Sequence, residues 1–74
     1  MLVEIKCFAT LSRHTPEGGL LDIDPGTTVS EIMERLGIDP AEVKIMFING
    51  VHTTPAAVLN AGDRLGLFPA VGGG

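Results

Sequence analysis

Alternating apolar and polar residues recur along the chain and predict a series of short β-strands. Near the start, Val3, Ile5 and Cys7 alternate with charged residues, which is typical of a strand that buries one face. Turn-forming pairs such as Gly18-Gly19 and Asn49-Gly50 separate the runs, and the second pair is a strong hairpin signal. The strands predicted in this way span residues 3–7, 20–24, 43–48, 51–53 and 64–68.

One amphipathic helix is predicted after the second strand. Thr28 is followed three residues later by Glu31, which predicts a capping box. Gly37 is placed to adopt the left-handed conformation that ends a helix, with Ile38 folding back as its apolar partner. The apolar stripe of this helix consists of Val29, Ile32, Met33 and Leu36.

Two further segments show weaker patterns. Residues 9–17 are expected to form a loop, with at most one short helical turn. In Thr54–Val58, Thr54 could cap a single helical turn that has Pro55 in its first position.

The order of these elements predicts an α+β domain with two layers. One helix and a short chain fit a β-grasp arrangement, which is a mixed sheet of four to five strands with the main helix packed across one face. In that arrangement the last strand lies beside the first in the centre of the sheet. We expect residues 1–69 to form a single β-grasp domain and residues 70–74 to form a flexible C-terminal tail.

Composition narrows the classes of function. The 74 residues, 45% of them hydrophobic, are sufficient for one small core. A net charge of −4 argues against nucleic-acid binding, since phosphates require a basic patch. Neither a membrane-spanning apolar stretch nor a secretory signal is recognisable, so we expect a cytoplasmic protein without a membrane partner. The single cysteine, Cys7, precludes an internal disulfide and is expected to be a small buried hydrophobe.

Residues with catalytic side chains do not form a recognisable constellation. His14 and His52 have no ligand-like neighbours in sequence, so no metal site is expected. Asp22 and Asp24 share one side of a strand, but no base or nucleophile accompanies them. Arg64 is expected to be solvated, or to meet an acidic residue of a partner. The chain is therefore not expected to be an enzyme by itself.

Three consecutive glycines, Gly72, Gly73 and Gly74, close the sequence. Glycines at a terminus contribute little to a fold, because each loses much backbone freedom on ordering. They do form a thin thread without Cβ atoms, which can enter a narrow channel. We therefore expect the carboxylate of Gly74 to be the reacting group, with Gly73 essential and Gly72 more tolerant. A frayed tail or a cloning scar is the alternative interpretation.

Three segments of the chain resemble a known family. They are Cys7–Leu11 at the end of the first strand, Thr28–Ile32 at the start of the helix, and Asn60–Leu65 followed by Phe68–Val71 and the glycines. Together they resemble the MoaD/ThiS group of ubiquitin-like sulfur carriers over nearly the whole length. The family often has a second proline where this chain has Ala70, and Gly72 precedes the usual glycine pair.

The resemblance implies that an E1-like adenylating enzyme uses ATP to adenylate the Gly74 carboxylate. A sulfur donor system then forms a thiocarboxylate, whose sulfur passes to an acceptor enzyme. No cofactor is expected on the chain itself. The acceptor would be the large subunit of molybdopterin synthase, with this chain as carrier subunit, or thiazole synthase. The long loop after the first strand and Phe68-Pro69 favour molybdopterin over thiamine thiazole or another sulfur metabolite.

Two other classes of function fit the same ending. A ubiquitin-like modifier would attach Gly74 to lysine amines of target proteins. A plain binding module would have an inert tail.

A docking patch for the activating and acceptor enzymes is predicted on the open face of the sheet. Strand parity places Phe8 and Phe68 on that face, and Phe47 joins them if Met46 and Ile48 face the helix. The predicted partner-binding residues are Phe8, Phe47, Phe68, Pro69, Val71 and Gly72.

Overall fold

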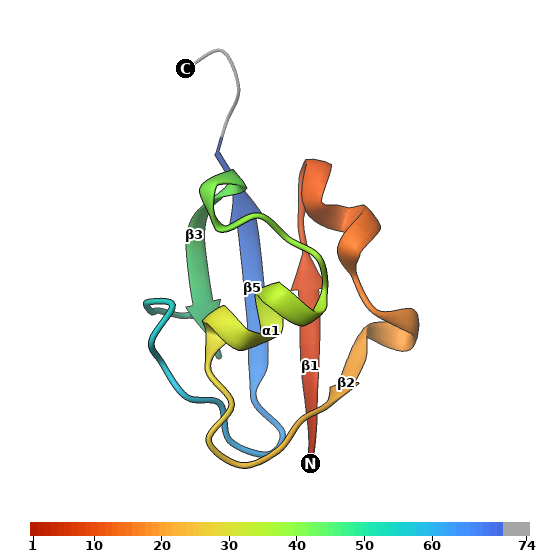
Figure 1. Ribbon diagram of the computed structural model, residues 1–74, viewed down its shortest axis with the longest axis vertical. Helices are drawn as coiled ribbons and strands as arrows, with labels where there is room; N and C mark the ends of the chain where they lie inside the picture. The colour runs from red at the N-terminus through yellow and green to blue at the C-terminus, as the bar shows by residue number, and fades with distance from the viewer. Residues whose placement is uncertain (71–74) are drawn as a thin grey trace.

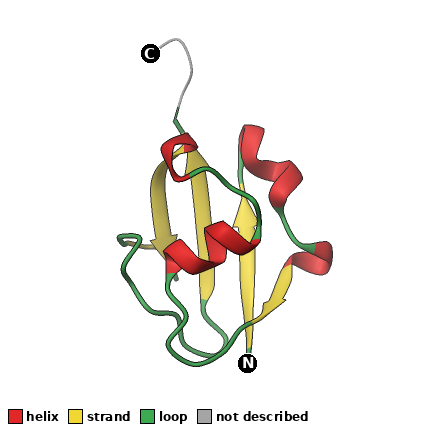
Figure 2. Cartoon of the chain, in the orientation of Figure 1, coloured by secondary structure: helices red, strands yellow, loops and turns green. Residues whose placement is uncertain are grey.

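The computed structural model describes residues 1–70, in which a five-stranded sheet is crossed on one face by a single α-helix (Figure 1). The strands are β1 (Leu2–Cys7), β2 (Leu20–Asp22), β3 (Val43–Ile48), β4 (Val51–His52) and β5 (Arg64–Pro69), and the helix is α1 (Val29–Arg35). Three short 3-10 segments also occur, and they are η1 (Ala9–His14), η2 (Glu17–Gly19) and η3 (Pro40–Glu42). Figure 2 draws them in red together with α1.

The strand order is β2-β1-β5-β3-β4. At its centre β1 and β5 run parallel, with Glu4 opposite Arg64 and Cys7 opposite Leu67, whereas the other neighbours are antiparallel. The first and last strands are therefore adjacent, as the β-grasp prediction requires. This pairing joins residues about 60 positions apart in the chain, such as Glu4 and Arg64.

Alternate residues of the strands build the core between the sheet and α1. In β1 and β5 the inward side chains are buried, while their neighbours point to the opposite face, which we call the open face. The segment η1 adds Leu11, which is 1% exposed. The other buried residues are Val3, Ile5, Cys7, Ile23, Val29, Ile32, Met33, Ile38, Met46, Leu59, Leu65 and Leu67.

The helix α1 begins and ends where the sequence predicts. The Thr28 hydroxyl oxygen accepts from the Glu31 amide at 3.2 Å, and the Glu31 carboxylate accepts from the Thr28 amide at 3.1 Å, which completes the capping box. After the helix, Gly37 has a φ of 73° and the Ile38 amide donates to the Met33 carbonyl at 2.9 Å. The predicted capping box and the predicted helix end at Gly37 are both confirmed. Each could be predicted because it depends only on residues close together in sequence.

The segment Thr54–Val58 differs from the predicted helical turn. The Ala57 amide donates to the Thr54 carbonyl, which closes one tight turn, and no helix follows. Carbonyls of this segment accept instead from the amides of Val29 and Ser30, each at 2.9 Å. Those amides have no partner within α1, so this tertiary contact caps the helix and overrides the local preference of the segment.

Removing the capping hydroxyl is expected to weaken the fold measurably. Thr28→Ala leaves the Glu31 amide without its acceptor, and we expect the free energy of unfolding to fall by about 1 kcal/mol in urea denaturation. Ser30→Ala, at an exposed position of the same helix, is the matched control. Equal destabilisation by the two variants would show that the capping box contributes nothing specific.

Candidate functional site

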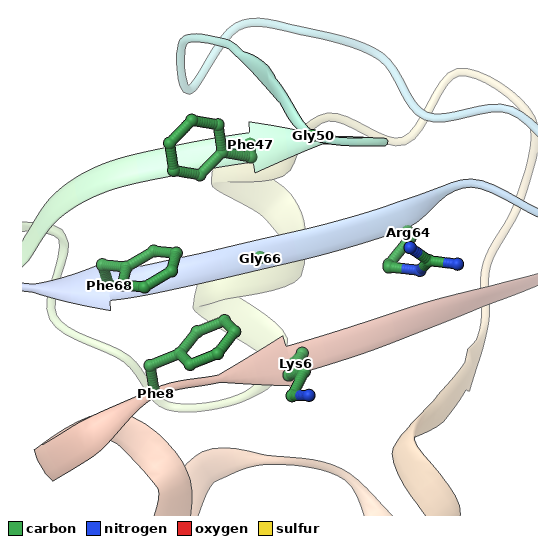
Figure 3. Close-up of a pocket in the computed structure, with 7 residues that line it drawn as sticks. All are labelled: Lys6, Phe8, Phe47, Gly50, Arg64, Gly66 and Phe68. Carbon is green, nitrogen blue, oxygen red and sulfur yellow. The ribbon is translucent and has the colours of Figure 1, made fainter.

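Three phenylalanine rings, one directly after β1 and the others in β3 and β5, meet on the open face (Figure 3). Phe8, directly after β1, stacks on Phe68 of β5 with ring centroids 4.1 Å apart and an interplanar angle of 6°. Phe47 of β3 meets Phe68 edge-on, with centroids 5.7 Å apart. All three residues remain partly exposed. We call these three residues the aromatic patch.

The position of Phe47 follows from the inward residues of β3. Met46 is 9% exposed and pairs with Leu67, so it faces α1, and Ile48 packs against the same core. Phe47 therefore points outward beside Gly66 of β5. The prediction placed Phe47 in the patch only if Met46 and Ile48 face the helix, and both residues do so.

A hollow of about 290 Å³ lies beside the aromatic patch. It extends from the rings along β1 and β5 toward two cationic side chains, Lys6 and Arg64 (Figure 3). Gly66 lies between Phe68 and Arg64 along β5, opposite Lys6. The residues that line it are Lys6, Phe8, Phe47, Gly50, Arg64, Gly66 and Phe68. We call it the Gly66 hollow.

The cations are arranged differently around this hollow. The Lys6 ammonium lies 5.4 Å from the centroid of the Phe8 ring, within range of a cation–π contact. Arg64 Nε donates to the Glu4 carboxylate at 2.7 Å, so it meets an acidic residue of its own chain. Both members of that pair are exposed, and such pairs contribute about 0–1 kcal/mol to stability.

Besides Arg64, three residues that line the hollow are not among the site residues predicted from the sequence, and they are Lys6, Gly50 and Gly66. His52 is exposed, and its ring contacts Phe47 edge-on, with centroids 4.8 Å apart. A glycine inside a strand does signal close approach by another group, and Gly66 was the one available clue.

The end of β5 is fixed by β3 and η3. Pro69 pairs with Val43, and the Ala70 amide donates to the Glu42 carbonyl at 2.9 Å. The chain therefore leaves the sheet next to the aromatic patch, since Phe68 directly precedes Pro69. The predicted site residues Val71, Gly72, Gly73 and Gly74 lie outside the described residues.

The histidine and aspartate residues singled out in the sequence lie outside the Gly66 hollow or at its margin. His14 Nδ1 is 3.2 Å from the Leu36 carbonyl oxygen at the end of α1. Asp22 accepts a hydrogen bond at 2.8 Å from the Met1 amine, which lowers the pKa of that carboxyl. Among residues 1–70, no group of three potential ligand residues is placed to hold a metal ion. The helices in this part of the chain are all too short or too polar to cross a membrane.

The Cys7 thiol is buried in the core, as predicted. It is 6% exposed, and burial raises the pKa of the thiol above its ordinary value of 9.0, although a hydrogen bond with Thr15 acts in the opposite direction. A raised pKa favours the neutral thiol in the folded state. The associated stability is present below the pKa of the unfolded chain and is lost as pH rises through the higher folded pKa.

This burial predicts slow reaction of Cys7 with thiol reagents. At pH 8 we expect a disulfide reagent such as DTNB to react much more slowly with the native chain than with the chain in urea, because the reagent needs an accessible thiolate. Free cysteine at the same pH and urea concentration is the control. A native rate equal to the unfolded rate would contradict the buried placement.

Within residues 1–70, the mixed five-stranded sheet and the one α-helix across it define a ubiquitin-like β-grasp domain. The chain belongs to the ThiS family, whose family model matches residues 5–74. No curated protein matches it.

Solved structures agree with this class. SAMP1 from Haloferax volcanii is 27% identical with a TM-score of 0.71, and the match covers 100% of both chains. A structure of H. volcanii small archaeal modifier protein 1 is 25% identical with a TM-score of 0.72, covering 95% of this chain and 98% of that one. A Pyrococcus furiosus protein named as a molybdopterin converting factor, subunit 1, is 21% identical with a TM-score of 0.73, covering 96% and 99%. At that identity the last comparison supports the fold alone.

Proposed function

We propose that this chain is a sulfur carrier whose Gly74 carboxylate is activated and converted to a thiocarboxylate for cofactor biosynthesis, with molybdopterin as the favoured product. One observation carries the proposal. The run Phe68–Ala70 leads from the central strand β5 toward the glycines, directly beside an exposed aromatic patch. A docked partner would thus receive the tail at a defined place.

The proposed chemistry assigns the catalytic groups to partner enzymes. The Gly74 carboxylate attacks the α-phosphorus of ATP on an E1-like enzyme, which releases pyrophosphate and leaves an acyl-adenylate. A sulfur donor then displaces AMP and forms the thiocarboxylate. The partner has to exclude water during this step, because water would hydrolyse the adenylate. Membership of the ThiS family supports a carrier role for this chain, with the catalytic groups on partner enzymes.

The aromatic patch is the proposed docking surface for the activating enzyme and for the acceptor enzyme. Stacked aromatic side chains left partly exposed on a small domain are typical of protein interaction sites. Pro69 continues the patch toward the tail, and Val71 and Gly72 are proposed to contact the same partners.

Intact-mass spectrometry tests the sulfur chemistry. The chain is incubated with its activating enzyme, ATP and a sulfide donor, and a matched sample lacks ATP. We expect a gain of about 16 Da only with ATP, since sulfur replaces one oxygen of the activated carboxylate. An unchanged mass in both samples, with an enzyme shown to be active, would overturn the proposed function.

A protein modifier is the second candidate function. The likeness to a small archaeal modifier protein at 25% identity favours it. In that case the activated Gly74 would form amide bonds with lysine side chains of other proteins. Covalent adducts of higher mass that depend on ATP, without a thiocarboxylate species, would select the modifier over the carrier.

A further inference from the structure

Gly66 occupies a strand position that does not require glycine. Its φ lies outside the left-handed region, so its backbone conformation suits any residue. A Cβ built there would lie 3.6 Å from Phe8 Cε2 and 4.0 Å from Phe68 Cε2, which are ordinary contacts. Because glycine weakens a strand interior relative to alanine, stability alone favours alanine at this position. What glycine provides is open space at the floor of the hollow.

Both charged side chains that line the Gly66 hollow, within residues 1–70, are cations. They are Lys6 and Arg64, two of the five Lys and Arg residues in a chain whose net charge is −4. Arg64 is paired with Glu4, whereas Lys6 forms no ion pair with any residue of the described chain. Lys6 is therefore the cation available to an incoming anion.

We propose that the Gly66 hollow receives one apolar side chain from a partner protein, within a segment that also presents a carboxylate to Lys6. The apolar side chain lies over Gly66 against Phe8 and Phe68, and the carboxylate lies beside the Lys6 ammonium. This inference deepens the docking role proposed above and rests on it. It specifies the chemistry of the partner surface as apolar and acidic.

Binding of matched peptides to the isotope-labelled full chain tests this proposal by NMR. Two helical peptides carry a leucine one turn away from a glutamate or, in the matched peptide, from a lysine. For the acidic peptide we expect amide shifts at Lys6, Gly66 and Phe68 and a dissociation constant on the order of 1 mM. The lysine peptide is expected to bind about two- to five-fold more weakly.

Two variants with a matched control separate the parts of the hollow. Gly66→Ala fills the floor and is expected to weaken the acidic peptide about tenfold or more, without lowering the urea midpoint. Lys6→Glu is expected to weaken it about five-fold. Lys44→Glu makes the same charge change at an exposed position that does not line the hollow, and it should have little effect.

Any of three results would overturn the proposal. The first is equal binding of the two peptides, and the second is absence of binding up to the solubility limit of the acidic peptide. The third is an equal effect of Lys6→Glu and Lys44→Glu on binding of the acidic peptide. Neither ATP nor an activating enzyme is present in this experiment. A chain that binds the acidic peptide but never gains sulfur would therefore retain this inference and overturn the proposed sulfur chemistry.

Discussion

Gly74→Ala is expected to reduce activation of the chain by at least about a hundredfold, because a misplacement of about 1 Å at a reacting group has an effect of that size. The added Cβ would clash with a channel that admits only a bare backbone, and the carboxylate would be displaced from the α-phosphorus of ATP. Gly73→Ala should act in the same way. The measurement is release of pyrophosphate by the activating enzyme at equal concentrations of each variant.

Gly72→Ala is the matched control for this prediction. It makes the same change one residue earlier, where we expect a much smaller loss. Urea denaturation should give the same midpoint for all three variants, since none of the three glycines belongs to the predicted domain of residues 1–69. Equal activation of Gly74→Ala and the wild-type chain would rule out a narrow channel around the reacting glycine.

Phe68→Ala is expected to weaken binding of the activating enzyme by about 2 kcal/mol, or about thirtyfold, which is typical of a central interface residue. Phe68 contacts both other rings of the aromatic patch, so its removal disrupts the whole surface. Calorimetric titration without ATP measures this affinity independently of the chemistry. Leu20→Ala is the control, because Leu20 is 50% exposed on β2, outside the patch.

A second variant keeps this prediction testable if Phe68→Ala folds poorly. Phe47→Ala removes the ring that meets Phe68 edge-on and leaves the stacked pair intact. We expect a smaller but measurable loss of affinity. If both variants fold and bind like the Leu20→Ala control, the docking role of the aromatic patch is refuted.

Some elements could be predicted from the sequence because their signals are local. The capping box of Thr28 and Glu31 forms within a single turn of chain. The same holds for the hairpin, where Asn49 and Gly50 have φ values of 53° and 80°, as a tight two-residue turn requires. Apolar and polar residues alternate only weakly after Leu21, so the end of the second strand was predicted less well. The strand β2 ends at Asp22, two residues before its predicted end.

The prediction for Thr54–Val58 failed for a physical reason. Thr54 and Pro55 are suitable for starting a helical turn, yet carbonyls of the segment bond to the first amides of α1. Those amides belong to residues about 25 positions earlier in the chain. No local pattern contains that contact.

The sequence by itself determined the strand and helix pattern, the outward parity of Phe8 and Phe68, and the glycine ending, since each depends on residues close together in the chain. The β-grasp prediction places the last strand beside the first, but only the tertiary structure decided the parallel register of β1 and β5, which brings Phe8 and Phe68 to 4.1 Å. It also settled the face of Phe47, because the apolar run of β3 has no polar alternate. Gly66 and Lys6 became parts of a site through the same pairing, which no single segment specifies.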